Sequence, residues 1–397
     1  MINENKNSLK GKDVHNFATK LLCMLPLTAH GALYKVTDIL NVVIFAAAFR
    51  TSINQASLSL QGAPCASNVL RRLTVQLQDL DQQQKIINEI LTSKLPKRIY
   101  KKKQKIAIDL VEIPYHGTVE QKYEEEVRRS KAKSGTTHFF VYATANILLK
   151  GNRYTIAMIR VSSSDCMLDV IKKLMMLIKE KGIRIKLLLL DRGFYSVKVI
   201  RYLKNKRQAF IMPAIKRGKK TDADGGPTCT NKLAALKKSG WHRYTLTSAT
   251  DGPVNFDVAV VCKNIKDSSR KESVRNTLIY VTFLVKHRPL DWVRETYRQR
   301  FGIESSYRQL HQARVKTSTQ NPALRLLFYA IALILRNVWV WLHTQIIATP
   351  RRGGKIANPE QMCFQRMLLW LFTEIGNQYT LIMEIFVSLD VRCILDG

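Results

Sequence analysis

The sequence predicts an α/β fold: a mixed sheet flanked by helices, with a β-rich insertion, an N-terminal helical domain and C-terminal helices. Two runs, at 106–111 and 185–190, are apolar on both faces, which is typical of central strands covered by helices. Between 104 and 215 the pattern gives three strands, a helix, a strand, a helix and a strand, as in a mixed sheet. Both ends of the chain show helical periodicity instead.

Composition limits the possible partners. The chain has 397 residues, of which 46% are hydrophobic, enough for two or three domains with a sizeable core. Lysine and arginine number 64 against 30 acids, a formal net charge of +34 that indicates a polyanionic partner. Nucleic acid is the first candidate, because lysine and arginine release the counterions of phosphates. An anionic membrane surface is the second.

The cysteines and the N-terminus predict a cytoplasmic protein. The seven cysteines include no C-x-x-C pair and form no Cys/His cluster, so neither a zinc site nor a disulfide framework is supported. The first 17 residues lack the apolar core of a secretory signal. The most apolar stretch, 326–347, contains Arg336, Asn337 and His343, which predicts a buried helix and no membrane span.

The first segment, 1–95, is expected to be a helical DNA-binding domain. Apolar residues recur at helical spacing from 14 to about 94, interrupted by the turn QGAPCAS at 61–67. Arg71 and Arg72 on the later helix suit DNA binding, but a plain helical bundle fits this pattern equally well.

The remaining chain divides into four segments. A basic run at 95–105 leads into the first part of a catalytic core, 96–215, and a β-rich insertion follows at 216–287. The core resumes at 288–347 with a polar helix and an apolar packing helix, and 348–397 is a C-terminal helical region. The insertion begins with a cationic stretch that is either a phosphate-contacting patch or a solvated loop: Lys216, Arg217, Lys219 and Lys220.

Two aspartates occupy apolar strands where a lone charge would be costly. Asp109 lies within the run at 106–111, and Asp191 follows the run at 185–190. A buried carboxylate has to be paired, neutral or bound to a cation. If the two strands are neighbours, both aspartates converge on one spot. Asp191 could alternatively cap the next helix, and Glu112 could replace Asp109, although three residues along a strand it faces the other side.

A third carboxylate lies on the helix after the insertion. Five residues spaced by three or four positions share one polar face of that helix: Tyr297, Arg300, Glu304, Arg308 and His311. The alternative interpretation of Glu304 is an exposed ion pair with Arg300 or Arg308.

Three carboxylates suit hard divalent cations, Mg²⁺ or Mn²⁺. Two such ions about 4 Å apart activate the attacking oxygen and stabilise the leaving one in an in-line displacement. This is phosphodiester chemistry. Arg300 and Arg308 would hold phosphate oxygens, and Tyr297 would contact a phosphate or a base.

With these motifs the sequence resembles the DDE transposases of prokaryotic insertion sequences, specifically the group with a β-rich insertion before the glutamate helix. Tyr297, Arg300 and Glu304 match the group's helix motif in residue and spacing, while His311 stands where the motif has lysine, so that Arg308 or Lys316 could take the role of that lysine. Asp109 in AIDLVEIPYHG and Asp191 in LLLLDRGFYS resemble the family's two aspartates. The resemblance covers about 105–345.

The resemblance implies a ribonuclease H-like catalytic domain that moves DNA by cut-and-paste transposition with two Mg²⁺ or Mn²⁺ ions. The implied partners are double-stranded DNA, as terminal inverted repeats and target, and a second copy of the chain in a synaptic homodimer, with no membrane and a nucleoid-associated location. Some members of the group close the cut end as a hairpin, and Trp292 is a candidate to stack an unpaired base. Two alternatives stay open: a metal-dependent nuclease of the same fold, and a transposase-derived DNA-binding protein without catalysis.

Overall fold

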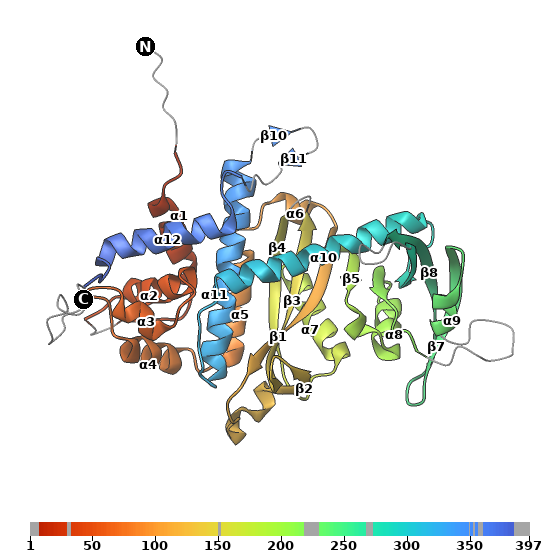
Figure 1. Ribbon diagram of the computed structural model, residues 1–397, viewed down its shortest axis with the longest axis horizontal. Helices are drawn as coiled ribbons and strands as arrows, with labels where there is room; N and C mark the ends of the chain where they lie inside the picture. The colour runs from red at the N-terminus through yellow and green to blue at the C-terminus, as the bar shows by residue number, and fades with distance from the viewer. Residues whose placement is uncertain are drawn as a thin grey trace, which may run out of the picture. The chain divides into compact units, whose positions relative to one another are not determined.

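The computed structural model of the chain describes residues 8–29, 33–149, 152–217, 230–266, 273–348, 350–351, 354–355 and 360–384. The chain forms two compact units (Figure 1). A helical unit comprises 1–90, 308–349 and 357–397, and a sheet unit comprises 91–307 and 350–356. The predicted class, a mixed sheet flanked by helices, is confirmed.

The sheet unit is built on one mixed sheet, whose described strands run in the order β2-β3-β1-β5-β6-β9-β8-β7, with β4 also paired to β3. Helices α7 (Met167–Glu180), α8 (Val197–Asn205) and the short α6 (Arg98–Lys101) and α9 (Thr230–Ala235) accompany it, together with the first part of α10 (Leu290–Gln312). The strands are β1 (Gln104–Tyr115), β2 (Arg128–Lys133), β3 (Thr136–Leu149), β4 (Asn152–Val161), β5 (Ile185–Leu190), β6 (Phe210–Pro213), β7 (Gly240–Ser248), β8 (Gly252–Lys266) and β9 (Ser273–Phe283).

The two runs that are apolar on both faces form adjacent parallel strands, the arrangement that the sequence left open. Ile108 of β1 is in register with Leu190 of β5. Both are fully buried, as is Ala107. A strand with helices or other layers on both faces has no solvent side, which explains why these segments do not alternate with polar residues.

The β-rich insertion does not form a separate sheet. Its last strand, β9, pairs antiparallel with β6, with Phe210 opposite Phe283. β8 and β7 then add in turn. The insertion therefore extends the central sheet and brings the residues of β9 next to the end of β6.

The helical unit joins both ends of the chain. It contains α1 (Gly11–Leu22), α2 (Val36–Ala48), α3 (Ile53–Leu58), α4 (Ala66–Gln76), most of α5 (Leu80–Ser93), α11 (Pro322–Leu342) and α12 (Phe364–Tyr379). The ring of Phe372 on α12 lies 4.8 Å from that of Phe45 and 4.9 Å from that of Phe49. The sequence predicted a final helix to about 389. α12 instead ends at Tyr379, followed by Thr380 with a φ of 62°, and residues from 385 lie outside the described chain.

The apolar stretch near 326–347 is a buried helix, as predicted. Among the described residues, Pro322–Ile347 is long and apolar enough to cross a membrane, but its apolar window is wholly buried within the protein. Asn321 caps the helix, since its side chain accepts hydrogen bonds from the backbone N–H groups of Ala323 and Leu324. His343, fully buried, bonds to the carbonyl of Met362 at 2.6 Å. The polar residues of this helix are thus accommodated by protein partners.

Candidate active site

Asp109, within β1, and Asp191, just beyond the end of β5, lie close together on two neighbouring strands. Because Ile108 and Leu190 are in register on parallel strands, the residues that follow them lie next to each other. Asp109 is 9% exposed overall, whereas the side chain of Asp191, just beyond the end of β5, is 39% exposed. The two strands are neighbours, the condition under which the sequence argument expected the aspartates to meet; their role in a metal site stays a prediction.

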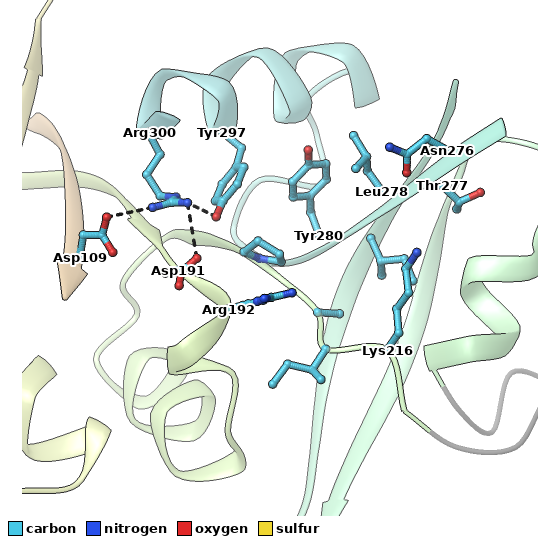
Figure 2. A pocket seen from close by; sticks show the side chains of 14 residues that line it. Asp109, Asp191, Arg192, Lys216, Asn276, Thr277, Leu278, Tyr280, Tyr297 and Arg300 are labelled. Atoms are coloured by element: carbon cyan, nitrogen blue, oxygen red, sulfur yellow. Dashed lines mark hydrogen bonds and ion pairs between the residues drawn. The ribbon is translucent and has the colours of Figure 1, made fainter. Parts of the chain in front are cut away.

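One guanidinium bridges the two carboxylates. Nη1 of Arg300 lies 3.2 Å from Oδ2 of Asp109, and Nη2 lies 3.4 Å from Oδ1 of Asp191 (Figure 2). The Arg300 side chain is only 7% exposed. A charge removed from water to this degree has to be compensated, and here two carboxylates compensate it.

The pKa of Arg300 is the result of opposing effects. Burial lowers it, but the neighbouring Tyr297 hydroxyl and the carboxylates of Asp109 and Asp191 outweigh burial and raise the pKa. Arg300 therefore stays charged between the aspartates.

Tyr297 holds Arg300 in place. The Tyr297 hydroxyl accepts a hydrogen bond from Nε of Arg300 at 2.9 Å and donates one to the carbonyl of Leu190 at 3.2 Å. The Tyr297 ring is buried in the core, 5.1 Å from the ring of Tyr280. Burial raises the pKa of Tyr297, with Arg300 opposing, so the hydroxyl stays protonated. The structure thus places Tyr297 as a positioning residue, and its contact with phosphate or base stays a prediction.

The structure also rejects two alternatives for the aspartates. Asp191 precedes a short 3-10 turn without capping it through its side chain, and Ser196 caps the following α8 by accepting from the N–H of Val199. Glu112 binds Nζ of Lys133 at 2.5 Å on β2. Asp191 is therefore not the cap of the next helix, and Glu112 does not take the place of Asp109.

The rest of the predicted helix face is divided between the two units. Glu304 follows Arg300 by four residues in α10, so its backbone lies on the same helix face, while its side chain lies outside the described residues. Arg308 and His311 belong to the helical unit. There His311 lines a pocket of about 240 Å³ with Arg50, Arg314 and Lys316. Burial, then Arg314 and Arg50, lowers the pKa of His311.

A cavity of about 780 Å³ opens beside the bridged carboxylates (Figure 2). Among its lining residues are Lys216, from the predicted cationic patch, and three that the sequence argument did not select: Arg192, Asn276 and Thr277. Arg192 follows Asp191 directly in the sequence, and this adjacency could have identified it as a residue of the cavity. Asn276 and Thr277 reach the cavity only because β9 joins the sheet.

The other predicted DNA contacts lie elsewhere. Arg217 does not line the cavity, and Lys219 and Lys220 lie outside the described residues. Trp292 is partly buried against the core of the sheet unit. Their contacts with DNA stay predictions.

The donor set of the cavity fits a hard divalent cation. Asp109 and Asp191 supply carboxylate oxygens, the ligands such ions prefer. Both carboxylates pair with the guanidinium of Arg300, which shows that they face a common space that holds a positive charge. Among the described side chains, no three His, Cys, Asp or Glu residues are grouped, and the third predicted ligand, Glu304, is not among those side chains.

Gly302 lets an arginine support the helix that carries Arg300. Arg153 of β4 donates hydrogen bonds to the carbonyls of Gly302 and Gln299. A Cβ on Gly302 would overlap the guanidinium group of Arg153. Any side chain at 302 therefore displaces Arg153.

We expect Gly302→Ala to lower the melting temperature, although the same change in an ordinary helix interior stabilises by about 1 kcal/mol. In an Arg153→Ala background the displaced side chain is gone, so Gly302→Ala should instead raise the melting temperature. Thermal unfolding of the two single variants and the double variant measures this. The same sign of effect in both backgrounds would contradict the contact.

Comparisons with known proteins bear on the fold and on the family. Among solved structures, the chain is similar to a piggyBac transposase in a synaptic complex with hairpin DNA, with a TM-score of 0.54 and 10% sequence identity, covering 98% of this chain and 85% of that one. At this identity the likeness concerns the fold. A search of curated proteins found no match.

The family comparison covers more than half of the chain. The model of the transposase DDE domain matches residues 100–336. That range contains Asp109, Asp191, Arg300 and the backbone position of Glu304. The chain therefore belongs to the family of transposase DDE domains.

Proposed function

We propose that this protein is an active DNA transposase that cleaves the ends of its element in a metal-dependent reaction and joins them to target DNA. The observation that carries the proposal is the convergence of Asp109 and Asp191 on one buried cationic group beside an open cavity. The family supports transposase chemistry. The carboxylates of Asp109 and Asp191, on neighbouring strands, would supply oxygen ligands of the kind that metal-dependent phosphoryl transfer uses.

In the proposed mechanism the residues of the protein would hold the divalent cations and position the DNA phosphate. Asp109, Asp191 and Glu304 would hold two Mg²⁺ or Mn²⁺ ions, which supply Lewis-acid activation of the attacking and leaving oxygens. Arg192 and Lys216 line the cavity and would bind phosphate oxygens near the carboxylates. Tyr297, hydrogen-bonded to the Leu190 carbonyl, keeps Arg300 oriented towards both aspartates.

The proposed partners are double-stranded DNA, as terminal repeats and as target, and a second copy of the chain. The net charge of +34 supports a polyanionic partner. The similar piggyBac transposase was determined as a synaptic complex with hairpin DNA, and we propose a homodimeric synaptic complex here also. Arg308, His311 or Lys316 would contribute further phosphate contacts. The proposed location is the cytoplasm, in association with the nucleoid.

The decisive experiment incubates the purified chain with 5′-labelled DNA that carries the terminal repeats flanking its gene. A supercoiled plasmid is added as the target. We expect cleavage at the repeat boundary and covalent joining to the plasmid in Mg²⁺, and neither product in EDTA. Cleavage without joining would favour the nuclease alternative. Binding without any cleavage in Mg²⁺ or Mn²⁺ would favour the DNA-binding protein that has lost catalysis.

A further inference from the structure

The cavity beside Asp109 and Asp191 is larger than a metal-bound phosphate needs. Its volume of about 780 Å³ falls among the pockets of roughly 300–1,000 Å³ that enclose a whole small organic molecule. Asp109 and Asp191 lie at one end of the cavity and Asn276 at the other (Figure 2). The cavity therefore has room for a complete nucleotide, with its phosphate beside the carboxylates.

The floor of the cavity between these two ends is apolar. Asn276, Leu278 and Tyr280 are every second residue of β9, so their side chains lie on one face of the strand. Pro213 is in register with Tyr280, and Ile215 follows it on the same neighbouring segment of the chain. Leu278 and Ile215 are half-buried and line the cavity. Such a surface suits the flat face of a nucleobase, which packs on apolar and aromatic side chains.

The two ends of the cavity fix the direction of a bound nucleotide. Tyr280 packs against Tyr297, which holds Arg300 between the two carboxylates. Asn276 lies four residues from Tyr280, about 13 Å along the strand. A phosphate at the carboxylates therefore places its base on Leu278 and the edge of that base near Asn276. A base stacked within a duplex cannot lie on this floor, so the base has to leave the stack, which costs least where its pairing is already weakened.

Asn276 is the side chain at the far end that is available for the edge of a base. It is exposed, and its amide forms no hydrogen bond with another described residue. The adjacent Thr277 is only 7% exposed, and its hydroxyl lies 3.8 Å from Sγ of Cys262. An asparagine amide both donates and accepts hydrogen bonds, as the edge of a base does. Lys216, exposed on the neighbouring segment, adds a positive charge for the next phosphate.

We infer that Asn276 determines part of the sequence specificity of cleavage, by binding the edge of one base that flanks the scissile phosphate and lies unstacked on Leu278. The inference rests on the proposed function, because it takes DNA as the substrate and the two aspartates as the reacting end of the cavity. Leu278 and Ile215 pack against the face of any base, so they contribute binding without selection. The amide of Asn276 contacts the edge, where bases differ, so it supplies the selection.

The test compares the cleavage of terminal-repeat DNAs that differ only in the base flanking the scissile phosphate, on either side, with all four bases at each position. We expect wild type to cleave DNA with the preferred base about tenfold faster than the others, the discrimination of one good amide–base contact. Asn276→Val should cleave all four at the rate of the disfavoured bases, since valine suits a strand but offers no hydrogen bond. Single-turnover rates in Mg²⁺ measure this.

Asn255→Val is the matched control for this substitution. Asn255 is an exposed asparagine on β8 of the same sheet, its side chain accepts a hydrogen bond from Thr245, and it does not line the cavity. The control should keep both the rate and the base preference of wild type. A base preference that is the same in wild type and in Asn276→Val would refute the contact.

An abasic nucleotide at the preferred position separates contact with the base from contact with the backbone. We expect wild type and Asn276→Val to cleave this DNA at equal rates, because the partner of the amide is missing from both reactions. An abasic nucleotide several positions further away should leave their difference of about tenfold intact. If the difference persists when either flanking base is removed, Asn276 does not bind a base there.

Failure of this inference is distinguishable from failure of the proposed function. If wild type neither binds nor cleaves terminal-repeat DNA, the proposed function fails first. If wild type cleaves but shows no preference at either flanking position, only the base contact is wrong. Thermal unfolding shows whether each variant is folded. Should Asn276→Val not fold, wild type alone decides, since removal of the preferred base should slow its cleavage about tenfold.

Discussion

Asp109→Asn and Asp191→Asn are each expected to lower the rate of end cleavage about a thousandfold or more. A divalent cation contributes several kcal/mol to stabilising the transition state of phosphoryl transfer, and about 1.4 kcal/mol corresponds to a tenfold change in rate. Asparagine has nearly the same shape as aspartate but offers one neutral oxygen. We expect Glu304→Gln to have a comparable effect. Single-turnover cleavage of labelled ends in Mg²⁺ measures all three.

Binding should survive these substitutions, because phosphate contacts supply most of the affinity. We therefore expect gel-shift affinities within about threefold of wild type. Glu112→Gln is the matched control: it removes a carboxylate from the same strand, but one that pairs with Lys133 instead of Arg300. It should cleave at the wild-type rate. Wild-type cleavage by Asp109→Asn, Asp191→Asn or Glu304→Gln would remove that residue from the site.

Arg300→Gln is expected to lower the free energy of unfolding by about 3 kcal/mol. Breaking a buried ion pair by removing one partner costs about 3–5 kcal/mol, and the lower end applies because the Asp191 side chain is 39% exposed. Arg298→Gln, two residues earlier on the same helix, removes an arginine whose pair with Glu295 is exposed. The control should cost less than about 1 kcal/mol. Urea unfolding in EDTA measures both.

The same variant tests the relation between Arg300 and the metal site. Without the guanidinium, Asp109 and Asp191 repel each other, and Mg²⁺ binding relieves that repulsion. Millimolar Mg²⁺ should therefore raise the melting temperature of Arg300→Gln more than that of wild type. Arg300→Lys keeps the charge but cannot reach both carboxylates as a planar fork does, so its stability should lie between the two. Equal losses for Arg298→Gln and Arg300→Gln would contradict the bridging role.

The strands, the helices and the candidate carboxylates could be predicted because each leaves a local pattern. The apolar runs around Asp109 and Asp191 identified central strands. A charged aspartate in such a strand needs a cation or another partner, which marked both residues as candidates. Tyr297, Arg300 and Glu304 were found by helical spacing. The positioning role of Tyr297 was missed, since spacing shows which residues share a face and not which of them is buried.

The sequence by itself determined the α/β class and the buried apolar helix around 326–347, and it singled out Asp109 and Asp191 as candidates, because burial and periodicity leave a pattern among neighbouring residues. Only the tertiary structure decided that Arg300 bridges Asp109 and Asp191 and that β9 brings Asn276 to the same cavity. These contacts join residues far apart in the chain, and they depend on strand pairing, which no local pattern specifies.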